Sequence, residues 1–331
     1  MNLSLKEAHE LAVAVLVKAG TSPANAAAVA RALVAAEADG LASHGMSRLP
    51  AYAAQVRSGK VDGQAAPTST HTGTAAVRID AADGFAFPAL ELAVEELAAL
   101  TPITGVSVAA IAASHHFGAA GYHVEALANR GLVALAFSNS PAAIAPAGGR
   151  SAIFGTNPIA MGAPMGAGKP PLVIDLSLSV AARGKIMVAA QRGEAIPGDW
   201  ALDAEGQPTT DAKAALAGTM LPIGGAKGAA LAFVVEVLTA SLTGSSIGHE
   251  AGSFFTAGGV KPRIGQLVLA FAPGPLSGGH FPERMAAMAA AILGQQGTRL
   301  PGERRLALRE KATLDGVNIP TALLEELRGL A

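Results

Sequence analysis

One short stretch of the sequence, "DGLASHGMSRLPAY" (39–52), concentrates side chains that could do chemistry. His44 is able to gain or lose a proton near neutral pH, and Ser43 beside it could hydrogen-bond the imidazole or a substrate oxygen. Arg48 carries a planar, permanently charged guanidinium that suits a carboxylate held by two parallel hydrogen bonds. Such a loop could process a 2-oxo or 2-imino acid. The alternative is a solvated loop whose arginine caps a helix end, and these residues alone leave both open.

A second candidate segment is "ASHHFGAAG" (113–121), which has two adjacent histidines between a predicted strand and a predicted helix. Adjacent side chains in extended chain point to opposite sides, and no carboxylate is close by in the sequence, so a metal site is disfavoured. We expect one ring to face a cofactor or substrate, with backbone N–H groups of the glycine-rich part available to an anion at the helix start. A buried, hydrogen-bonded histidine pair is the alternative that the residues leave open.

Three further segments combine glycines with polar residues. "IFGTNPIAMGAP" (153–164) and "IDLSLSVAARGK" (174–185) lie at the ends of apolar runs, where open sheets place ligand contacts. "LPIGGAKGAALA" (221–232) opens a predicted helix with Lys227 among glycines, an arrangement that could hold a phosphate. Ordinary turn chemistry is the alternative explanation for all three.

Several classes of protein are excluded or disfavoured by what the sequence lacks. The chain has no cysteine, so disulfides, thiolate catalysis and zinc–thiolate sites are excluded, and the absence of an H-E-x-x-H pattern disfavours a zinc hydrolase. Its formal net charge of −1 provides no basic field for nucleic acid or anionic lipid. No G-x-G-x-x-G separates a strand from a helix, and "GAPMGAGKPP" (162–171) lacks the spacing of a phosphate-binding loop.

The elements that must position these residues follow from periodicity. The chain of 331 residues is half hydrophobic and has 39 glycines and 20 prolines, which favours a packed protein with many turns. Apolar spacing predicts a mixed α/β or α+β fold without repeats, in which Ser22 caps a helix that has Pro23 at its first position and ends at Gly40. The remaining predicted helices are 3–19, 49–56, 88–99, 119–129, 226–243 and 281–295, before a polar, basic tail, and the predicted strands are 74–84, 105–114, 131–140, 171–179 and 262–273.

The N-terminus and the apolar runs together bear on location. "MNLSLKEAHELAVAVL" (1–16) has Lys6 and Glu7 where a signal peptide would need a cationic start and an uninterrupted apolar run, so it is better interpreted as an amphipathic helix. No stretch reaches about 18 uninterrupted apolar residues, so we expect no membrane span. A cytoplasmic protein is expected.

Taken together, these segments resemble the malate/L-lactate dehydrogenase-like family of NAD(P)-dependent oxidoreductases, which is unrelated to the ordinary lactate dehydrogenases. The matching pieces include "DGLASHGMSRLPAY", "SHHFGAAGY", "FGTNPIA", "IDLSLSVAARGKI", "LPIGGAKGAALAFVVEVLTASLTG" and "RLPGERR", in order over nearly the whole chain. The resemblance implies a non-Rossmann NAD(P)-binding sheet domain with a helical substrate and dimerisation lobe, and a homodimer. It divides the chain into an N-terminal helical and substrate lobe (1–115), a cofactor lobe (116–260) and a C-terminal strand and helices that pack back on the first lobe (261–331).

Within that family, "GKVDGQAAPT", "RIDAADGFAFPAL" and "RLPGERR" look most like the Δ1-piperideine-2-carboxylate/Δ1-pyrroline-2-carboxylate reductases. This resemblance implies NADPH-dependent reduction of a cyclic imino acid to L-pipecolate or L-proline, with NADH as a possible substitute for NADPH. The alternative is an NAD(P)-dependent 2-hydroxy-acid dehydrogenase acting on malate, lactate or ureidoglycolate, and a non-catalytic ligand-binding protein on the same scaffold is a third. At three places the sequence departs from the pattern of the cyclic imino acid reductases. "GAAGY" (118–122) and Lys185 follow the wider family, where some imine reductases have bulkier and acidic residues, and "DLSLS" (175–179) replaces the commoner D-x-A-T-S.

The resemblance also assigns roles to individual residues. Ser43 and His44 would form a proton-relay pair, with Arg48 and Thr156 at the substrate carboxylate and no metal. His116 is the second candidate for the acid/base, because other branches of the family use the histidine at that position. Arg299, Arg304 and Arg305 could meet a 2′-phosphate of NADPH. The implied cofactor contacts are His116, Phe117, Gly118, Ala119, Ala120, Asp175, Leu176, Ser177, Gly225, Lys227, Arg299, Gly302, Glu303, Arg304 and Arg305.

Overall fold

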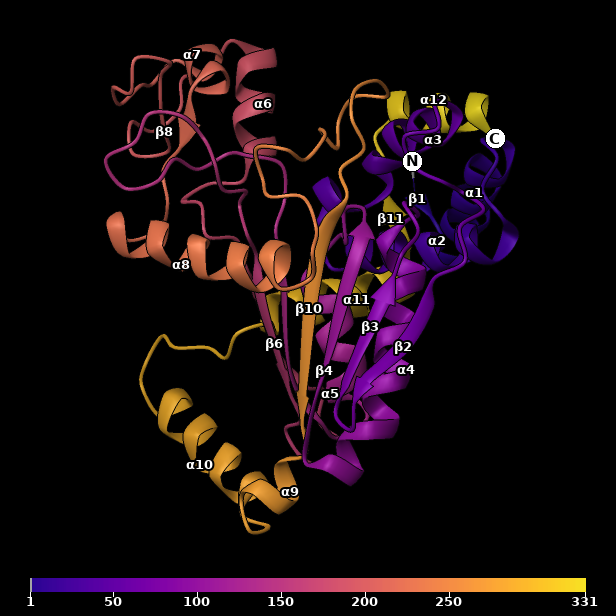
Figure 1. The fold of residues 1–331 in the computed structure, drawn as a ribbon, viewed down its shortest axis with the longest axis vertical. Coiled ribbons are helices and arrows are strands. Elements are labelled where there is room, and N and C mark those ends of the chain that lie inside the picture. The colour runs from indigo at the N-terminus through magenta and orange to yellow at the C-terminus, as the bar shows by residue number, and fades with distance from the viewer. Residues whose placement is uncertain (1) are drawn as a thin grey trace.

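A seven-stranded mixed sheet runs through the centre of the protein, whose computed structural model describes residues 2–331 (Figure 1). Its strand order is β2-β3-β4-β10-β5-β6-β7, and every neighbouring pair is antiparallel except β3 and β4. The mixed α/β fold class is therefore confirmed. The strands are β2 Thr68–Gly73, β3 Ala76–Asp80, β4 Val106–Ser114, β5 Val133–Ser138, β6 Ile159–Ala163, β7 Leu172–Leu176 and β10 Ile264–Phe271.

The last strand in the sequence lies in the middle of this sheet. β10 pairs with β4 on one side and with β5 on the other, opposite Ala109 and Ala136 at Val268. One sheet thus contains strands from all three of the segments 1–115, 116–260 and 261–331. The division into three parts stays a prediction. The apolar runs predicted as strands do form β4, β5, β7 and β10, while β2 and β6 were not predicted.

Two helices cover one face of the sheet and a third lies on the other. α4 (Ala86–Thr104) and α5 (Ala120–Ala128) bury apolar side chains such as Leu90, Leu97 and Val124 against the strands. α8 (Ala226–Glu236) and the π-helical turn that follows it (Val237–Ser241) contact β5 and β10 from the opposite side. α5 begins directly after the β4 histidine segment, so its first turn is held where β4 ends.

An N-terminal lobe of helices stands at one end of the sheet, at the upper right of Figure 1. It contains α1 (Leu5–Lys18), α2 (Pro23–Ala38) and α3 (Leu49–Arg57), which share a core with the C-terminal α12 (Thr321–Leu330). As predicted, the Ser22 hydroxyl caps α2, accepting a bond from Asn25 N at 3.3 Å, with Pro23 in its first turn. Gly40 follows the helix at φ 76°.

The C-terminal part returns to this lobe. The short strand β11 (Val317–Asn318) pairs with β1 (Asn2–Leu3), and α11 (Glu303–Asp315) packs against α2. The polar, basic stretch expected after residue 295 is largely helical, because it contains α11 and α12. α11 carries charged residues over most of its surface and has little apolar periodicity to reveal it, since Ala312 is its one buried residue.

A second small lobe, at the upper left of Figure 1, was not predicted in detail. It packs apolar residues such as Ile144, Leu178 and Ile186 against α8. The remaining helices α9 and α10 leave the far end of β10, with Met285 of α10 contacting Leu172. No helix within residues 2–331 combines the length and apolar character needed to cross a bilayer. The elements of the second small lobe and the two helices after β10 are α6 Arg183–Arg192, α7 Ala212–Ala217, β8 Ala201–Leu202, β9 Thr219–Met220, α9 Pro273–Leu276 and α10 Phe281–Leu293.

Candidate active site

A cavity of about 1310 Å³ opens where the N-terminal lobe, the edge of the sheet and the second small lobe meet. This volume exceeds the roughly 300–1,000 Å³ of ordinary small-ligand pockets, so it has room for a large cofactor together with a substrate. The predicted site residues on its wall come from five chain segments. The predicted site residues that line it are Ser43, His44, Arg48, Thr156, His116, Phe117, Gly118, Ala119, Asp175, Leu176, Ser177, Gly302, Arg304 and Arg305.

Five predicted contacts lie away from that wall. Ala120 is buried in the first turn of α5, directly behind the wall. Gly225 and Lys227 are exposed at the start of α8, and Arg299 and Glu303 are exposed beside the start of α11. Their role in cofactor binding stays a prediction, and so do the roles of the residues that line the cavity.

The loop after α2 is shaped by its own backbone and by Glu37. Two 3-10 turns, Ala42–His44 and Met46–Arg48, lead into α3. Glu37 accepts a bond from Met46 N at 2.8 Å, and a Cβ at Gly45 would collide with the same carboxylate. Burial raises the pKa of Glu37. The loop is therefore anchored to the lobe at Gly45 and Met46, while Leu41, Ala42, Ser43 and Ser47 are exposed.

Ser43, His44 and Arg48 are hydrogen-bonded into one unit on the cavity wall. Ser43 Oγ lies 3.0 Å from His44 Nδ1, and Arg48 Nε donates to Ser43 O at 2.6 Å. The Arg48 guanidinium lies 4.8 Å from the centre of the Phe255 ring and does not cap α3. Its Nη1 atom is buried without a partner. A buried donor without an acceptor costs free energy, so this atom is where a ligand oxygen would be stabilised.

The two adjacent histidines at the end of β4 have different surroundings. His116 lines the cavity, its Nδ1 lies 2.6 Å from the Tyr52 hydroxyl, and its ring stacks on His44 with centroids 5.5 Å apart. His115 is buried behind it, with Nε2 at 2.7 Å from Gln55 Oε1. The pair thus satisfies both interpretations of the segment, since one ring faces the cavity and the other is a hydrogen-bonded core histidine.

Burial and the Arg48 charge keep these imidazoles neutral. Burial, with Arg48 nearby, lowers the pKa of His44 from 6.5 to about 4. Burial, with Lys60 and Arg48, lowers the pKa of His115 to about 3, and burial together with Arg48 and His44 holds the pKa of His116 well below its ordinary value. At neutral pH the Arg48 guanidinium therefore lies beside neutral rings in this part of the cavity, a setting that favours an anionic ligand.

The start of α5 and the end of β7 form the opposite wall. Gly121 N donates to Asp175 Oδ2 at 2.8 Å, and burial raises the pKa of that carboxyl although this bond opposes the shift. Gly118 has φ 70°, and a Cβ there would lie 2.9 Å from the Phe87 ring, so glycine is required. Backbone N–H groups at a helix start beside a carboxylate acceptor suit the phosphates and hydroxyls of a dinucleotide.

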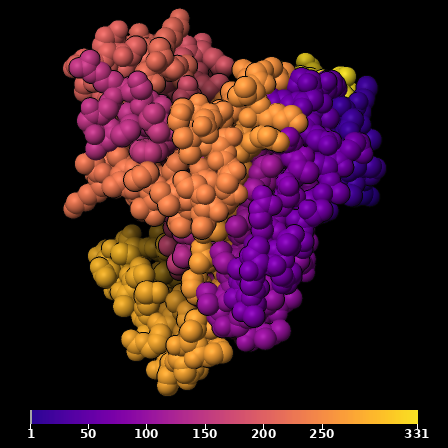
Figure 2. Space-filling view, viewed as in Figure 1, coloured from indigo at the N-terminus to yellow at the C-terminus, as the bar shows by residue number. Residues whose placement is uncertain are grey.

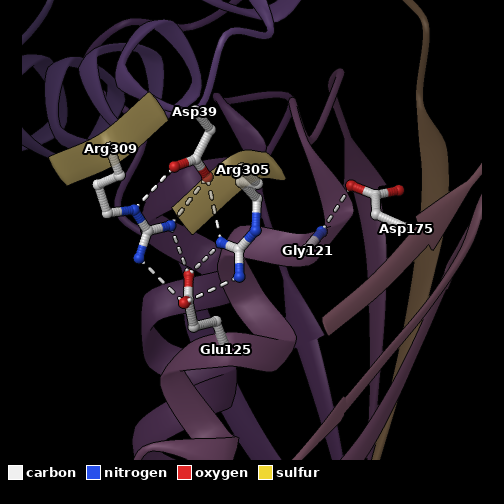
Figure 3. Close-up of polar contacts among 6 residues, drawn as sticks. All are labelled: Asp39, Gly121, Glu125, Asp175, Arg305 and Arg309. Carbon is white, nitrogen blue, oxygen red and sulfur yellow. Dashed lines mark hydrogen bonds and ion pairs between the residues drawn. The ribbon is translucent and has the colours of Figure 1, made fainter. Parts of the chain in front are cut away.

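The arginines of the C-terminal motif differ in their surroundings. Arg304 is exposed and lines the cavity. Arg305 is bonded to Glu125 at 2.7 Å and to Asp39 at 3.1 Å, a cluster completed by Arg309 (Figure 3). An arginine with a free guanidinium meets a phosphate at lower cost than one already paired with carboxylates, so Arg304 is the better placed of the two for a 2′-phosphate.

Sequence reasoning missed the side chains that support Thr156. Its N–H donates to Ser140 Oγ at 3.0 Å, and the next residue, Asn157, has φ 39°. Asn157 Nδ2 donates to Glu236 Oε2 at 2.7 Å, and the same buried glutamate accepts from Gly248 N at 2.6 Å. Glu236 lies at the junction of α8 with the π-helical turn, and nothing in the sequence around it indicates that this one acidic residue is buried.

The loop at residues 248–258 was also missed. Phe254 packs on His116 with centroids 4.8 Å apart, and Phe255 lies under Arg48. Lys60, which is buried, donates to three carbonyls of this loop, at Ser253, Thr256 and Gly258. Figure 2 shows this orange segment lying against the purple N-terminal part of the chain. An adjacent phenylalanine pair in a chain that is only 4% aromatic was the available signal.

The start of α6 adds two cations near Ser43. Arg183, Gly184 and Lys185 line the cavity, and a Cβ at Gly184 would lie 4.0 Å from Ser43 Cβ. Burial lowers the pKa of Arg183, whose guanidinium also donates to Leu216 O at 3.4 Å. Lys185 Nζ lies 5.9 Å from the centre of the Trp200 ring. Within residues 2–331 no three histidine or acidic side chains are grouped to hold a metal ion.

Comparison with known proteins agrees with this geometry. The family model described as malate/L-lactate dehydrogenase matches residues 3–328. A (2R)-3-sulfolactate dehydrogenase (NADP(+)) of Chromohalobacter salexigens is 52% identical over 329 residues, covering 99% of this chain and 98% of that protein. A Δ1-pyrroline-2-carboxylate/Δ1-piperideine-2-carboxylate reductase of Pseudomonas putida is 42% identical, covering 98% of this chain and 94% of that protein. The crystal structure of the Δ1-piperideine-2-carboxylate reductase of Pseudomonas syringae matches with TM-score 0.94 at 40% identity, over 100% of each chain.

Proposed function

The chain belongs to the malate/L-lactate dehydrogenase family, and we propose that it interconverts a small 2-oxo or cyclic 2-imino carboxylate and its reduced form with NADP(H). The observation that carries the proposal is the unit of Ser43, His44 and Arg48 on the cavity wall, with the unpaired Nη1 of Arg48. It combines a proton carrier with a carboxylate site, the two groups that reduction next to a carboxylate needs.

When bound, the cofactor supplies the hydride. The first turn of α5 and the end of β7 would hold it. The missing Cβ atoms of Gly118 and Gly121 let this turn pack closely on Phe87 and Val173, and Asp175 accepts from Gly121 N. Arg304 would meet the 2′-phosphate of NADPH. Replacing Arg304 by glutamate should raise the KM for NADPH more than that for NADH, and equal effects on both would contradict this assignment.

Arg48 would bind the substrate carboxylate through its free edge. Nε is committed to Ser43 O, so the guanidinium has a fixed orientation, and the unsatisfied Nη1 becomes paired when a carboxylate arrives. The Phe255 ring against the guanidinium keeps water from one side of it. A carboxylate held this way leaves the adjacent C2 carbon beside His44 and between it and the cofactor wall, which is the arrangement that hydride transfer requires.

His44 would hold the proton that moves to or from the substrate heteroatom. Its Nδ1 faces Ser43 Oγ at 3.0 Å, so the hydroxyl orients the ring and completes the relay. His116, stacked on His44 and bonded to Tyr52, is the second candidate for this role. Replacing each histidine by glutamine separates them. Loss of turnover with His44→Gln and a smaller effect with His116→Gln is expected, and the opposite order would transfer the role to His116.

The charges near Ser43 favour a 2-oxo acid that has a second anionic group. Arg183 and Lys185, at the start of α6, add positive charge beside the His44 unit, and neither is paired with a carboxylate in the ion pairs of residues 2–331. A sulfonate or carboxylate at C3 would be stabilised there, while a cyclic iminium would be repelled. The sulfolactate dehydrogenase at 52% identity has such a substrate in its name.

Cyclic imines remain the second candidate. The reductases named for them are 39–42% identical to this chain over nearly its full length. Both substrate types have the 2-carboxylate for which the Arg48 site is proposed. The preference between them therefore depends on the residues that surround the rest of the substrate.

The deciding experiment follows NADPH absorbance with 3-sulfopyruvate, oxaloacetate, pyruvate, Δ1-pyrroline-2-carboxylate and Δ1-piperideine-2-carboxylate. Faster turnover with the two doubly anionic acids is expected, and Lys185→Glu should reduce that preference. Faster turnover with the cyclic imines would establish the second candidate. Turnover with none of the five would contradict the proposed function as a whole.

The apolar surface of α8 supports a homodimer. Phe233, Val234, Val237 and Leu242 are exposed by 43–62% and recur at helical spacing on one side of the helix. A second copy of the chain that covered this stripe would remove it from water. Light scattering on the wild type and on Val237→Glu tests this, with a dimer and a monomer as the expected results. A monomeric wild type would contradict it.

A further inference from the structure

Asp39, Glu125, Arg305 and Arg309 form a nearly buried cluster (Figure 3). It lies between α5, α11 and the loop after α2 that contains Ser43, His44 and Arg48, which we call the catalytic loop. Arg309 donates to Asp39 at 2.7 and 2.8 Å and to Glu125 at 3.0 and 2.8 Å. Arg305 adds one bond to Asp39 and two to Glu125. The two carboxylates are below 10% exposed, and Arg309 is the most exposed member at 33%. The cluster is charge-balanced, with two anions and two cations.

Such a cluster is a poor way to gain stability but a good way to fix orientation. Desolvation of paired charges cancels most of their attraction, so apolar side chains of similar volume would hold the same elements as firmly. Forked guanidinium–carboxylate bonds, by contrast, specify both distance and angle. The seven bonds of this cluster therefore point to a requirement for precise placement of Asp39 and Glu125.

Asp39 stands where α2 becomes the catalytic loop. It is the residue after the helix, and Gly40 follows with φ 76°, four residues before His44. α11 also touches this point directly, because a Cβ at Gly40 would lie 2.6 Å from Leu308 Cδ1. The direction in which the loop leaves α2 is thus set by α11, an element more than 260 residues away in the sequence.

Glu125 is buried in α5, whose first turn forms the opposite wall of the cavity. The first turn of α5 has its own attachment, the bond from Gly121 to Asp175 (Figure 3). Loss of the cluster would therefore leave the start of α5 tethered to β7 while freeing the start of the loop. The two walls differ in how far they depend on α11.

We propose that Arg309 is a positioning residue, which sets the distance between the Ser43–His44–Arg48 unit and α5 by holding Asp39 and Glu125 together. Through it, docking of α11 is coupled to alignment of the substrate end of the cavity. The kinetic part of this inference rests on the proposed function. The structural part does not, because the position of the loop is measurable without a substrate.

The test is Arg309→Met, followed by amide hydrogen exchange and by steady-state kinetics. Exchange over residues 40–48 should become about tenfold faster or more, while the amides of 120–124 keep their protection. The value of kcat should fall about tenfold or more and the substrate KM should rise, with the KM for NADPH within about threefold of wild type. Arg309→Lys keeps the charge without the fork and should give a smaller change in the same direction, and it replaces the Met variant if that variant does not fold.

Two further variants separate positioning from charge and from general stability. Arg31 lies on α2, the helix that ends at Asp39, and forms a bidentate pair with Glu91 of α4. Arg31→Met removes this pair and should leave exchange at 40–48 unchanged. The double variant Asp39→Asn with Arg309→Met leaves one anion and one cation, so it restores charge balance without restoring the bonds. It should stay as defective as the single variant.

Three results would overturn the proposal. Recovery of kcat in the double variant would mean that only the uncompensated charge mattered. Unchanged exchange at 40–48 in Arg309→Met would mean that the cluster does not hold the loop. An equal loss of kcat in Arg31→Met would reduce the effect to stability. Failure of the wild type to turn over any substrate would contradict the proposed function, and the exchange experiment would still decide the positioning role.

Discussion

Acid should destabilise this protein steeply, because four of its histidines are buried in their neutral form. Burial is the main cause in each case, lowering the pKa of His44 and His123 to about 4 and that of His115 to about 3, and holding the pKa of His116 well below its ordinary value. When the chain unfolds these rings meet water and titrate near 6.5. Between pH 6.5 and 4 the unfolded state therefore binds more protons than the folded state does, and stability falls as pH falls.

The size of the effect follows from these values. At pH 5 each of His44, His115 and His123 has lowered the free energy of unfolding by about 2 kcal/mol relative to pH well above 6.5, or by about 6 kcal/mol for the three together, and His116 shifts it in the same direction. Burial raises the pKa of Glu37 and Asp175, which bind protons more readily in the folded state and offset part of this loss. Since whole domains are stable by only about 5–15 kcal/mol, we expect the protein to be close to unfolding near pH 5.

Urea denaturation at pH 7.5, 6 and 5, followed by circular dichroism at constant ionic strength, measures this dependence. His123→Gln isolates one ring, since His123 does not line the large cavity and its Nε2 contacts Phe117 O at 2.9 Å, a contact that an amide can replace. The variant should lose about 2 kcal/mol less than wild type between pH 7.5 and 5. His280→Gln, at an exposed histidine, is the matched control and should change nothing. An identical pH dependence in wild type and His123→Gln would refute the reasoning.

Three other substitutions test individual supports of the site. Lys60→Met removes three bonds to the 253–258 loop, so it should lower the free energy of unfolding, measured by urea denaturation, by about 3 kcal/mol and raise the substrate KM. An unchanged KM would show that the loop keeps its position without Lys60. Tyr52→Phe leaves His116 Nδ1 without its partner, and should lower stability by about 1–3 kcal/mol but kcat by less than about tenfold if His44 is the proton carrier. Asp175→Ala leaves the buried Gly121 N–H unpaired, so we expect a lower melting temperature and a higher KM for NADPH, with substrate KM as the control that stays constant.

Local sequence signals predicted the elements whose packing is local. Ser22 and Pro23 marked the start of α2, and apolar runs marked β4, β5, β7 and β10, of which the central β10 is buried over most of its length. Strand order was not predictable, since the position of β10 between β4 and β5 is decided by pairing across more than 100 residues. β2 is exposed over nearly its whole length, so it has no apolar alternation to detect. α11 was not predicted for a similar reason, because only Ala312 of this helix is buried and its sequence has little apolar periodicity.

The site was predicted where its residues are neighbours in the chain. Ser43, His44 and Arg48 stood out because three reactive side chains in six residues are unusual in a chain with 15% charged residues. The residues that support them come from distant segments and have ordinary roles in isolation. Lys60 looks like any surface lysine, and nothing in the sequence indicates that its ammonium is enclosed by three carbonyls of a loop some 190 residues away. Long-range polar contacts of this kind become visible only in the folded chain.

The electrostatics of the site couple substrate binding to proton transfer. Without a ligand, burial and the Arg48 cation lower the pKa of His44 to about 4, so the ring is a neutral base at pH 7, as oxidation of a 2-hydroxy acid requires. A carboxylate paired with Arg48 cancels one of the two causes of that shift, so the pKa of His44 rises toward the range in which it can give up a proton. Reduction of a 2-oxo acid would need that second state, toward which a bound carboxylate shifts the ring. In the proposed function Arg48 would therefore do more than hold the carboxylate, because its charge would make the protonation of His44 depend on whether the carboxylate is there.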